Sequence, residues 1–536
     1  MNTRLLLPTP EGIEEAARLL REGALVAIPT ETVYGLAANA LDSAAVASIF
    51  AAKGRPVDNP LIVHIADMQD WAPLVQTIPD NARRLAEAYW PGPLTIILPA
   101  APCIPAEVRG GLTTVAVRFP ADPVAQAVIL HAGCPLAAPS ANRSGAPSPT
   151  NAARVMEDMQ GRIAAVLDGG SCAVGVESTV VDLCSEPPRL LRPGGITPEM
   201  LEAVVGEIRI DPAVTHALKA GAVAASPGMK YKHYAPKARV RLVKGTPAAY
   251  RAYVEAHKAP GVAALCFDED VPYLTVPTVA YGHRDAPLEQ AHQVFDALRR
   301  LDEMGAQTVL AACPQPKGVG LAVYNRMIRA AAFDIVNTIR VIGLTGPTGA
   351  GKSTVAAVWR QMGLPVIDCD ALARQVTQPD SPCLSALAET FGGDIRRADG
   401  SLDRALLAQR AFADPDATAR LNAITHPAIL ALIRQRLEDA ADAGYGTAVL
   451  DAPTLFEAGA DALCDTVVAV LAPAEQRLAR IRARDGLSPE QAQRRMAAQP
   501  PDGFYTRPGV QVLDNAGSEE TLRDSAARLA RGWLPS

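Results

Sequence analysis

A glycine-rich loop near residue 346 carries the clearest chemistry in the sequence. Residues 339–354 read IRVIGLTGPTGAGKST, with Gly346, Gly351, Lys352 and Ser353 at the spacing of a phosphate-binding loop. Glycines let backbone N–H groups surround a phosphate, the lysine reaches the β- and γ-phosphates, and the serine hydroxyl holds Mg²⁺. An apolar, strand-like run precedes the loop and a helical pattern follows it, so a chance glycine-rich turn is the weaker interpretation. We predict ATP binding here.

A second group of polar side chains gathers at expected strand ends in the first 208 residues. Guanidinium, ammonium, hydroxyl and amide groups together suit a phosphate and a small zwitterion. Solvated loop polarity explains any one of them about as well, and a lone histidine such as His64 is more often a core residue than a ligand. The group comprises Lys53, Arg55, Arg118, Ser140, Asn142, Ser178 and Arg192.

Lysine usage singles out one position in each part of the chain. Of the 51 basic residues only nine are lysines. Lys53 is the only lysine in residues 1–218, and Lys352 is the only one in residues 338–536. In a chain that otherwise uses arginine, a lysine indicates a place where a compact ammonium is needed.

Alternating strand and helix patterns must position these residues. The first part predicts strands at 25–29, 61–65, 94–98, 114–119, 164–167, 178–183 and 189–191, with helices at 11–22, 43–52, 80–89, 123–131 and 151–159. Residues 30–36 (TETVYGL) read as a ligand-facing turn after the first of these strands. The fold class is α/β throughout, with a large twisted sheet, a small Rossmann-like α/β module and a parallel sheet behind the phosphate-binding loop. We place the domains at 1–208, 238–336 and 337–536, with a linker at 209–237.

Composition narrows the class of protein. A length of 536 residues predicts roughly three to four domains. Residues 1–337 carry 30 basic and 33 acidic side chains and the remainder 21 and 24, so each part has a net charge of −3 and neither is a basic nucleic-acid module. The nine cysteines form no CxxC pair, which favours reduced thiols in a cytoplasmic protein. No signal peptide pattern and no run of 18 apolar residues is seen, so we expect a soluble chain with no membrane partner.

The motifs PTETVYGL, KGRP, NPLxxH, SAN and RPG occur in this order before residue 195. In order and spacing they resemble the threonylcarbamoyl-AMP synthase family, which has the YrdC-type fold. The resemblance implies synthesis of threonylcarbamoyl-AMP and pyrophosphate from L-threonine, bicarbonate and ATP. The product feeds the N6-threonylcarbamoyladenosine modification of tRNA, so the tRNA threonylcarbamoyl-transfer complex is an implied partner, without stable nucleic-acid binding by this chain.

The same resemblance assigns roles by position. Lys53 and Arg55 are the implied catalytic cations, because attack on the α-phosphorus builds charge on the departing pyrophosphate. The implied threonine ligands are Thr32, His64, Arg118, Ala138 and Ser178. The implied ATP ligands are Lys53, Arg55, Asn59, Thr114, Ser140, Asn142, Ser148, Arg192, Tyr231 and Tyr234.

Residues 219–237 (KAGAVAASPGMKYKHYAPK) hold four of the nine lysines. The stretch SPGMKYKHYAP matches the linker of two-domain synthases, which implies a lid over the nucleotide that uses Tyr231 or Tyr234. A basic interdomain tether is the alternative. Residues 238–336 resemble the C-terminal domain of the same family, and we expect a structural or regulatory role for them, because no catalytic constellation is visible there.

Residues 338–536 resemble dephospho-coenzyme A kinase from end to end, through the loop already described, DCD at 368–370, HP at 426–427, PTLFE at 453–457 and LDN at 513–515. The resemblance implies transfer of phosphate from ATP to the ribose 3′-hydroxyl of dephospho-CoA. Asp370 would be the base, Ser353 and Asp368 would hold Mg²⁺, and Arg404 and His426 are candidate acceptor contacts. ATP would be cradled by Thr348, Gly349, Ala350, Gly351, Lys352, Ser353 and Thr354.

Two departures from the kinase pattern bear on activity. Pro347 removes one backbone donor from the loop. The Arg-Glu-x-Arg segment expected before LDN is replaced by PPDGFYTRP at 500–508, which leaves Arg507, or the arginine run 477–484, as the substitute lid cation.

The sequence therefore predicts a fusion of two independent enzymes that use ATP and Mg²⁺. One alternative is an active synthase joined to a nucleotide-binding domain of weak kinase activity. The other makes the N-terminal part an RNA-binding module, against which the charge balance and the lack of an aromatic-basic stripe argue.

Overall fold

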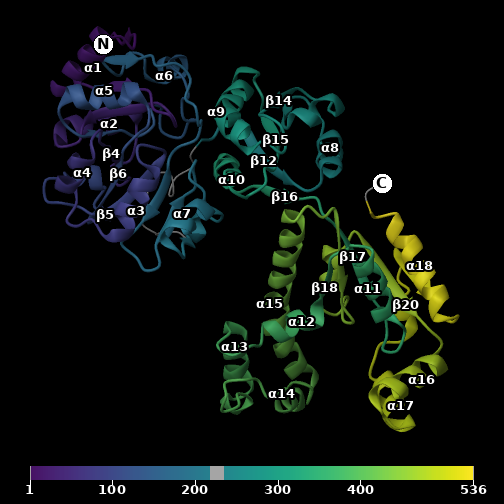
Figure 1. The fold of residues 1–536 in the computed structure, drawn as a ribbon. Coiled ribbons are helices and arrows are strands. Elements are labelled where there is room, and N and C mark those ends of the chain that lie inside the picture. The colour runs from purple at the N-terminus through teal and green to yellow at the C-terminus, as the bar shows by residue number, and fades with distance from the viewer. Residues whose placement is uncertain (1, 218–233, 535–536) are drawn as a thin grey trace. The chain divides into compact units, whose positions relative to one another are not determined.

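The computed structural model describes residues 2–217 and 234–534. The chain divides into two compact units (Figure 1). The first comprises Met1–Val243 and Tyr250–Val336, and the second comprises Lys244–Ala249 and Asn337–Ser536.

A mixed sheet of eleven strands forms the centre of the first part of unit one. Its order is β1 (Arg4–Leu6), β8 (Ala165–Leu167), β2 (Val26–Ile28), β3 (Gly35–Asn39), β7 (Leu136–Ala137), β4 (Ile62–His64), β6 (Thr114–Arg118), β5 (Leu94–Pro99), β9 (Thr179–Asp182), β10 (Arg189–Arg192) and β11 (Arg209–Ile210). Helices α1 (Pro10–Arg21), α2 (Ser43–Lys53), α3 (Asp80–Tyr89), α4 (Ala106–Arg109), α5 (Pro123–Ala132), α6 (Ala152–Met159) and α7 (Pro198–Val205) accompany it. The sheet mixes parallel and antiparallel pairs, which brings strand ends and loops from distant parts of the sequence close together.

Local sequence explains where the helix that carries Lys53 begins and ends. The Asp42 carboxylate accepts from the N–H groups of Ala44 and Ala45, which caps the start of α2. Gly54 follows the last residue, Lys53, with φ of 64°, a left-handed conformation that glycine adopts without a Cβ penalty. This stop places the Lys53 ammonium at the end of a rigid helix.

A smaller sheet completes the first unit. Its strand order is β14 (Thr278–Ala280), β13 (Val262–Cys266), β15 (Thr308–Ala312), β12 (Arg239–Lys244) and β16 (Ile335–Asn337), and the helices are α8 (Pro247–Ala256), α9 (Pro287–Glu303) and α10 (Gly320–Ala330). Strands β12, β13, β14 and β15 pair in parallel, as expected where helices connect consecutive strands. Every residue of α10 is buried, including its two arginines.

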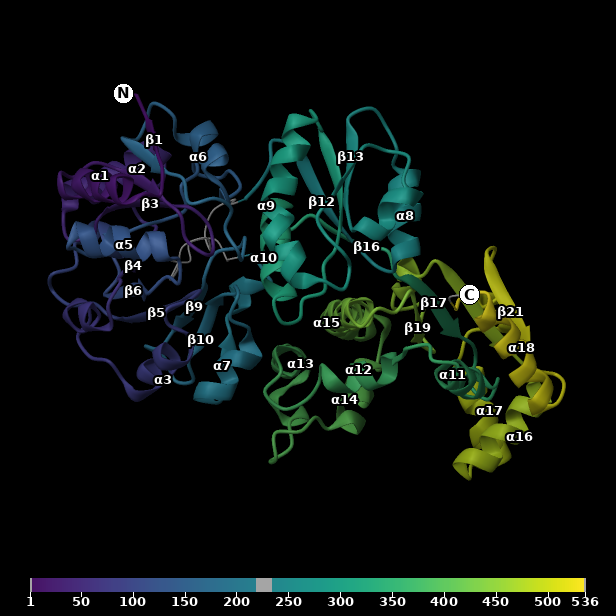
Figure 2. The same cartoon turned by 45° about the horizontal axis from the view of Figure 1, so that its top comes forward.

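The second unit is a doubly wound domain with a five-stranded parallel sheet. The order is β18 (Val366–Asp368), β19 (Thr447–Asp451), β17 (Arg340–Thr345), β20 (Thr466–Leu471) and β21 (Val510–Asp514). Helices α11 (Lys352–Gln361) and α18 (Glu519–Arg531) pack together, and α16 (Ala474–Asp485) lies beside α17 (Pro489–Ala497) (Figure 2). The remaining helices are α12 (Cys369–Gln375), α13 (Pro382–Phe391), α14 (Arg404–Ala411) and α15 (Pro415–Asp442). The phosphate-binding loop leaves β17, the central strand, which places it at the carboxyl edge of the sheet.

The predicted α/β class is confirmed in both units. Helix α3 has the predicted bounds. The predicted turn at 30–36 was too long, because Gly35 already begins β3, whose GLAAN sequence lacks the β-branched residues that mark a strand. In the two described stretches we find no helix that is both long and apolar enough to cross a membrane.

Candidate functional sites

The first candidate site is a cavity in unit one where strand ends, the end of α2 and two loops meet. It is lined by Thr32, Val33, Lys53, Arg55, Ile62, His64, Arg118, Ala138, Pro139, Ser140, Asn142, Glu177, Ser178, Arg192 and Tyr234. The structure thus brings together all five residues predicted for threonine and most of those predicted for the synthase nucleotide. Four cationic side chains face one small volume, which suits a polyanionic ligand.

Lys53 is held by the loop that follows β7. Its Nζ donates to the carbonyl oxygens of Ser140 and Asn142, the latter at 2.6 Å, and to Asn142 Oδ1 at 3.3 Å. These three oxygens hold the ammonium at the cavity wall. Burial and the nearby Arg55 lower the pKa of Lys53 well below its usual range. A phosphate in the cavity would offset that loss and favour the charged form.

A buried ion pair supports the side of the cavity predicted for threonine. Arg118 donates from a terminal nitrogen to Thr32 Oγ1 at 2.9 Å, and its other terminal nitrogen lies 2.7 Å from Glu31 Oε1. His64 lies next to this pair on β4, with Nδ1 3.2 Å from the carbonyl oxygen of Ile62. Burial and the Arg118 charge lower the pKa of His64 to about 3, so the imidazole is neutral at pH 7.

Ser178 and Arg192 connect the neighbouring strands β9 and β10. Arg192 donates from Nε to the Ser178 carbonyl oxygen at 2.9 Å and from a terminal nitrogen to Ser178 Oγ at 3.0 Å. Burial lowers the pKa of Arg192, and likewise of Arg55, to about 10, which leaves both guanidinium groups charged at neutral pH. The Ser178 hydroxyl also shares a 2.7 Å hydrogen bond with Thr95 Oγ1.

Some predicted residues lie away from the cavity wall. Asn59 is buried and its carbonyl oxygen accepts from Arg55 at 3.5 Å, and Thr114 begins β6. Ser148 donates at 2.5 Å to the carboxylate of Glu177. Tyr234 is buried and lines the cavity, whereas Tyr231 lies outside the described residues.

Two acidic residues of this site were not predicted. Glu31 pairs with Arg118, and Glu177 lies in the wall of the cavity. A carboxylate within the otherwise uncharged stretch AVGVESTVV is the signal that could have identified Glu177, because a buried charge needs a partner.

The second candidate site surrounds the glycine-rich loop in unit two. Its cavity is lined by Gly346, Pro347, Thr348, Gly349, Ala350, Gly351, Lys352, Ser353, Thr354, Asp370, Pro453, Arg480, Arg484, Arg495 and Gln499. All seven residues predicted to cradle ATP therefore face one volume. Gly351 has φ of 105° at the start of α11, and a Cβ there would lie 2.3 Å from Asn515 Nδ2.

Side chains from three distant segments hold the loop. Gln499 Oε1 accepts from the Thr348 N–H at 2.8 Å, Asn515 Nδ2 donates to the Ala350 carbonyl oxygen at 2.7 Å, and Arg477 Nε donates to the Thr348 carbonyl oxygen at 3.1 Å. These contacts fix the backbone that would receive the phosphates.

The ammonium of Lys352 pairs with the carboxylate of Asp451, which ends strand β19. No role was predicted for Asp451, although a carboxylate at the end of a β-branched strand next to a phosphate-binding loop is a usable signal. Asp370 lies in the same cavity, and burial, followed by Asp368 and Asp451, raises its pKa, which the Lys352 charge opposes.

The two aspartates of the DCD motif lie differently. Asp368 accepts from the Ala371 N–H at 2.9 Å and so caps α12, whereas Asp370 lines the cavity. Between them, burial raises the pKa of the Cys369 thiol to about 12, which agrees with an unreactive side chain.

Arg507, one of the two candidates for the lid cation, does not line this cavity. Its guanidinium lies over the rings of Phe456 and Phe504, at 4.3 and 4.1 Å, and Nε donates to the Phe504 carbonyl oxygen. These two rings, one from the altered segment and one from the PTLFE motif, hold the guanidinium there.

Three other arginines line the cavity. Arg480 donates to the Gly349 carbonyl oxygen, and Arg484 and Arg495 both pair with Asp485 at 2.8 Å. The predicted acceptor contacts lie elsewhere: Arg404 donates to Thr377, and His426 lies on α15, outside this cavity.

Comparison with known proteins connects both sites to established families. Residues 18–194 match the family model described as Telomere recombination, and residues 196–332 match Threonylcarbamoyl-AMP synthase, C-terminal domain. Residues 340–520 match Dephospho-CoA kinase. The chain is 46% identical over 346 residues to the threonylcarbamoyl-AMP synthase of Pyrococcus abyssi, covering 62% of this chain and 99% of that protein. It is 46% identical over 191 residues to the dephospho-CoA kinase of Anaeromyxobacter dehalogenans, covering 36% of this chain and 90% of that protein. The chain belongs to both families.

The synthase part also matches a solved structure. The crystal structure of P. abyssi Sua5 complexed with L-threonine superimposes with a TM-score of 0.59 and 45% sequence identity, covering 63% of this chain and 99% of that one. The predicted fusion of a two-part synthase with a kinase is thereby confirmed. Each cavity lies within the stretch that matches its own family.

Proposed function

We propose that this chain is a bifunctional enzyme that makes threonylcarbamoyl-AMP and pyrophosphate from L-threonine, bicarbonate and ATP, and phosphorylates dephospho-CoA with ATP. The threonylcarbamoyl-AMP would then serve the modification of tRNA adenosine. The observation that carries the proposal is the presence, in one chain, of two separate phosphate-binding cavities, each built by residues of one matched family.

In the synthase cavity, Lys53, Arg55 and Arg192 bind the ATP phosphates, and Thr32, Arg118 and Ser178 bind threonine. The neutral His64 offers a polar contact to threonine without adding a cation. The carbamate oxygen formed from threonine and bicarbonate attacks the α-phosphorus, and the bond to pyrophosphate breaks. The cations stabilise the charge that develops on this leaving group, and the rigid strand ends hold the two reactants close together.

In the kinase cavity, the loop N–H groups and Lys352 bind the β- and γ-phosphates of ATP. Asp370 accepts the proton of the acceptor hydroxyl, whose oxygen then attacks the γ-phosphorus as the bond to ADP breaks. Serine and aspartate oxygens are hard donors that suit Mg²⁺, and Ser353 together with Asp368 or Asp451 would hold it. Arg480, Arg484 and Arg495 line the cavity and supply the cations that the altered segment lacks. This observation favours a working kinase over a domain that only binds nucleotide.

We propose the domain division 1–208, 238–336 and 337–536, with 209–237 as the linker. Substrate omission tests both activities with the full-length chain. We expect pyrophosphate release only when ATP, L-threonine and bicarbonate are all present, and CoA only when ATP and dephospho-CoA are present. Pyrophosphate release that is indifferent to threonine would refute the synthase, and CoA formation at the rate of the enzyme-free control would refute the kinase.

A further inference from the structure

Helix α10 of the small module carries an arginine that has no contact with water. Arg326 is 0% exposed, and every other residue of the helix is buried as well. A guanidinium in such surroundings is tolerated only where acceptors replace its hydration. The hydrogen-bond acceptors of Arg326 therefore show which part of the protein this helix stabilises.

Those acceptors lie beside the synthase cavity. Arg326 Nε pairs with Glu177 Oε2 at 2.9 Å, one terminal nitrogen donates to the Pro193 carbonyl oxygen at 2.6 Å, and the other donates to the Glu177 carbonyl oxygen at 3.3 Å. Glu177 directly precedes Ser178, and Pro193 directly follows Arg192. One side chain from the small module thus connects the backbones beside two residues of the cavity wall.

The carboxylate that Arg326 holds is itself part of that wall. Burial opposes ionisation of Glu177, but Arg326 and then Arg192 hold its pKa below the usual value. Glu177 is therefore an anion in a cavity built for anionic ligands. Arg326 and the Ser148 hydroxyl occupy its two oxygens, at 2.9 and 2.5 Å, which restrains it from competing with a phosphate for Arg192.

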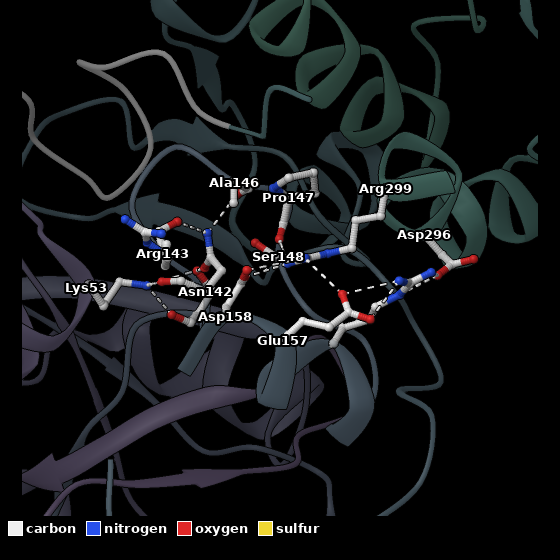
Figure 3. Close-up of polar contacts among 12 residues, drawn as sticks. Lys53, Asn142, Arg143, Ala146, Pro147, Ser148, Glu157, Asp158, Asp296 and Arg299 are labelled. Carbon is white, nitrogen blue, oxygen red and sulfur yellow. Dashed lines mark hydrogen bonds and ion pairs between the residues drawn. The ribbon is translucent and has the colours of Figure 1, made fainter. Parts of the chain in front are cut away.

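A second arginine of the small module reaches the loop that holds Lys53. Arg299 on α9 donates to the Pro147 carbonyl oxygen at 2.6 Å and pairs with Asp158 at 2.7 Å. Pro147 belongs to the same loop as Asn142, which accepts from Lys53 and donates to the Ala146 carbonyl oxygen at 2.7 Å (Figure 3). The loop is therefore tied to Lys53 at one end and to the small module at the other.

We propose that Arg326, assisted by Arg299, is a positioning residue of the synthase reaction, so that the 238–336 module completes the synthase site. The inference rests on the proposed synthase function. Arg326 acts through Glu177, Ser178 and Arg192 and touches no substrate. Without it, Glu177 turns towards Arg192 and neutralises a charge that ATP needs.

Steady-state pyrophosphate release by the full-length chain tests this, because the kinase releases ADP and does not contribute to the signal. Arg326→Gln should raise the KM for ATP by about tenfold or more, the loss expected for one charge-assisted hydrogen bond, with a smaller change in kcat. The double variant Arg326→Gln, Glu177→Gln should return to within about threefold of Glu177→Gln alone, because the released anion is gone. Arg299→Gln should raise the same KM by a smaller factor.

Arg154→Gln is the matched control. Arg154 on α6 also connects the large sheet domain to α9, through Asp296 at 2.8 Å and Glu303, but it does not line the cavity. Its loss should leave the KM for ATP unchanged. If Arg154→Gln raised the KM for ATP by the same factor, the effect would come from the general stability of the interface, and the proposal would be overturned.

Two further measurements keep the outcomes separate. The affinity for L-threonine alone, measured by calorimetry, should fall severalfold in Arg326→Gln, because Ser178 is displaced. This measurement does not depend on turnover, so it remains informative if the wild-type chain releases no pyrophosphate. That absence of pyrophosphate would refute the synthase function itself. If Arg326→Gln does not fold, Arg326→Lys keeps the charge with fewer donors and should raise the KM for ATP to an intermediate degree. An unchanged KM and an unchanged threonine affinity in a folded Arg326 variant would contradict the inference, as would a double variant no better than Arg326→Gln.

Discussion

Replacing Gly351 by alanine should disable the kinase through geometry alone. The residue has φ of 105°, and a Cβ would lie 2.3 Å from Asn515 Nδ2 and 3.1 Å from Leu522 Cδ2. To reach even 3.0 Å, the loop or Asn515 must move by about 0.7 Å. Asn515 is 4% exposed and donates to the Ala350 carbonyl oxygen, so its displacement leaves a loop carbonyl without its donor.

The magnitude follows from two separate costs. Left-handed backbone strain costs about 1–2 kcal/mol of stability for a residue with a Cβ. The collision adds about 1 kcal/mol for the lost hydrogen bond, and a displacement approaching 1 Å in a phosphate cradle costs about 100-fold in rate. We therefore expect Gly351→Ala to lower the kinase kcat/KM about 100-fold while threonine-dependent pyrophosphate release keeps its wild-type rate.

Gly363→Ala separates strain from collision. Gly363 also has positive φ, 89°, but nothing lies within 4 Å of the position that a Cβ would take there. It should lower the melting temperature of the second unit while retaining the kinase kcat/KM. CoA formation, followed by chromatography at several ATP concentrations, measures both variants. Wild-type kinase kinetics in Gly351→Ala would refute this account of the loop. If Gly363→Ala lost as much activity as Gly351→Ala, backbone strain alone would explain the loss.

Three further predictions concern single residues. Asp370→Asn should abolish CoA formation. In the wild-type chain the rate of CoA formation should rise with pH through a pKa above about 4, the usual aspartate value, because burial raises the pKa of Asp370 and the base must be ionised. A rate that is flat from pH 4 to 8 would contradict the assignment. The pKa of His64 is about 3 in the folded state and about 6.5 in the unfolded state, so the unfolded state binds more protons between these pH values, and the free energy of unfolding of unit one should fall by up to about 5 kcal/mol as pH falls through that window. In chemical unfolding, the free energy of unfolding of His64→Gln should depend less steeply on pH. An identical slope would argue against a buried neutral imidazole. Arg507→Ala should destabilise the second unit by about 1 kcal/mol through the lost contacts with Phe456 and Phe504, yet leave the kinase kcat unchanged; a large fall in kcat would restore Arg507 as the lid cation.

The sequence predicted the structure best where a motif lies within one short stretch of the chain. The glycine-rich loop could be predicted because its spacing, the preceding strand and the following helix all lie within about 25 residues. Lys53 was indicated by its rarity in an arginine-rich chain, and the structure places it in a cavity with the predicted arginines. The bounds of α3 followed from its helical pattern and its acidic start.

The parts that were missed depend on partners distant in sequence. Glu177 is explained by Arg326, 149 positions away, and Asp451 by Lys352, 99 positions away. Arg507 was proposed as a lid cation because it is near the missing segment in sequence, but the two phenylalanine rings beside it determine where it lies. A short strand such as β3 was missed because sheet neighbours, not local propensity, stabilise it.

The central claim is that one chain carries two enzymes with separate phosphate sites. Its most direct test supplies ATP, L-threonine, bicarbonate and dephospho-CoA together and quantifies threonylcarbamoyl-AMP and CoA in the same reaction by mass spectrometry. We expect the wild-type chain to make both products, Lys53→Ala to make only CoA, and Lys352→Ala to make only threonylcarbamoyl-AMP. Loss of both products from either substitution, or of neither from both, would contradict the account.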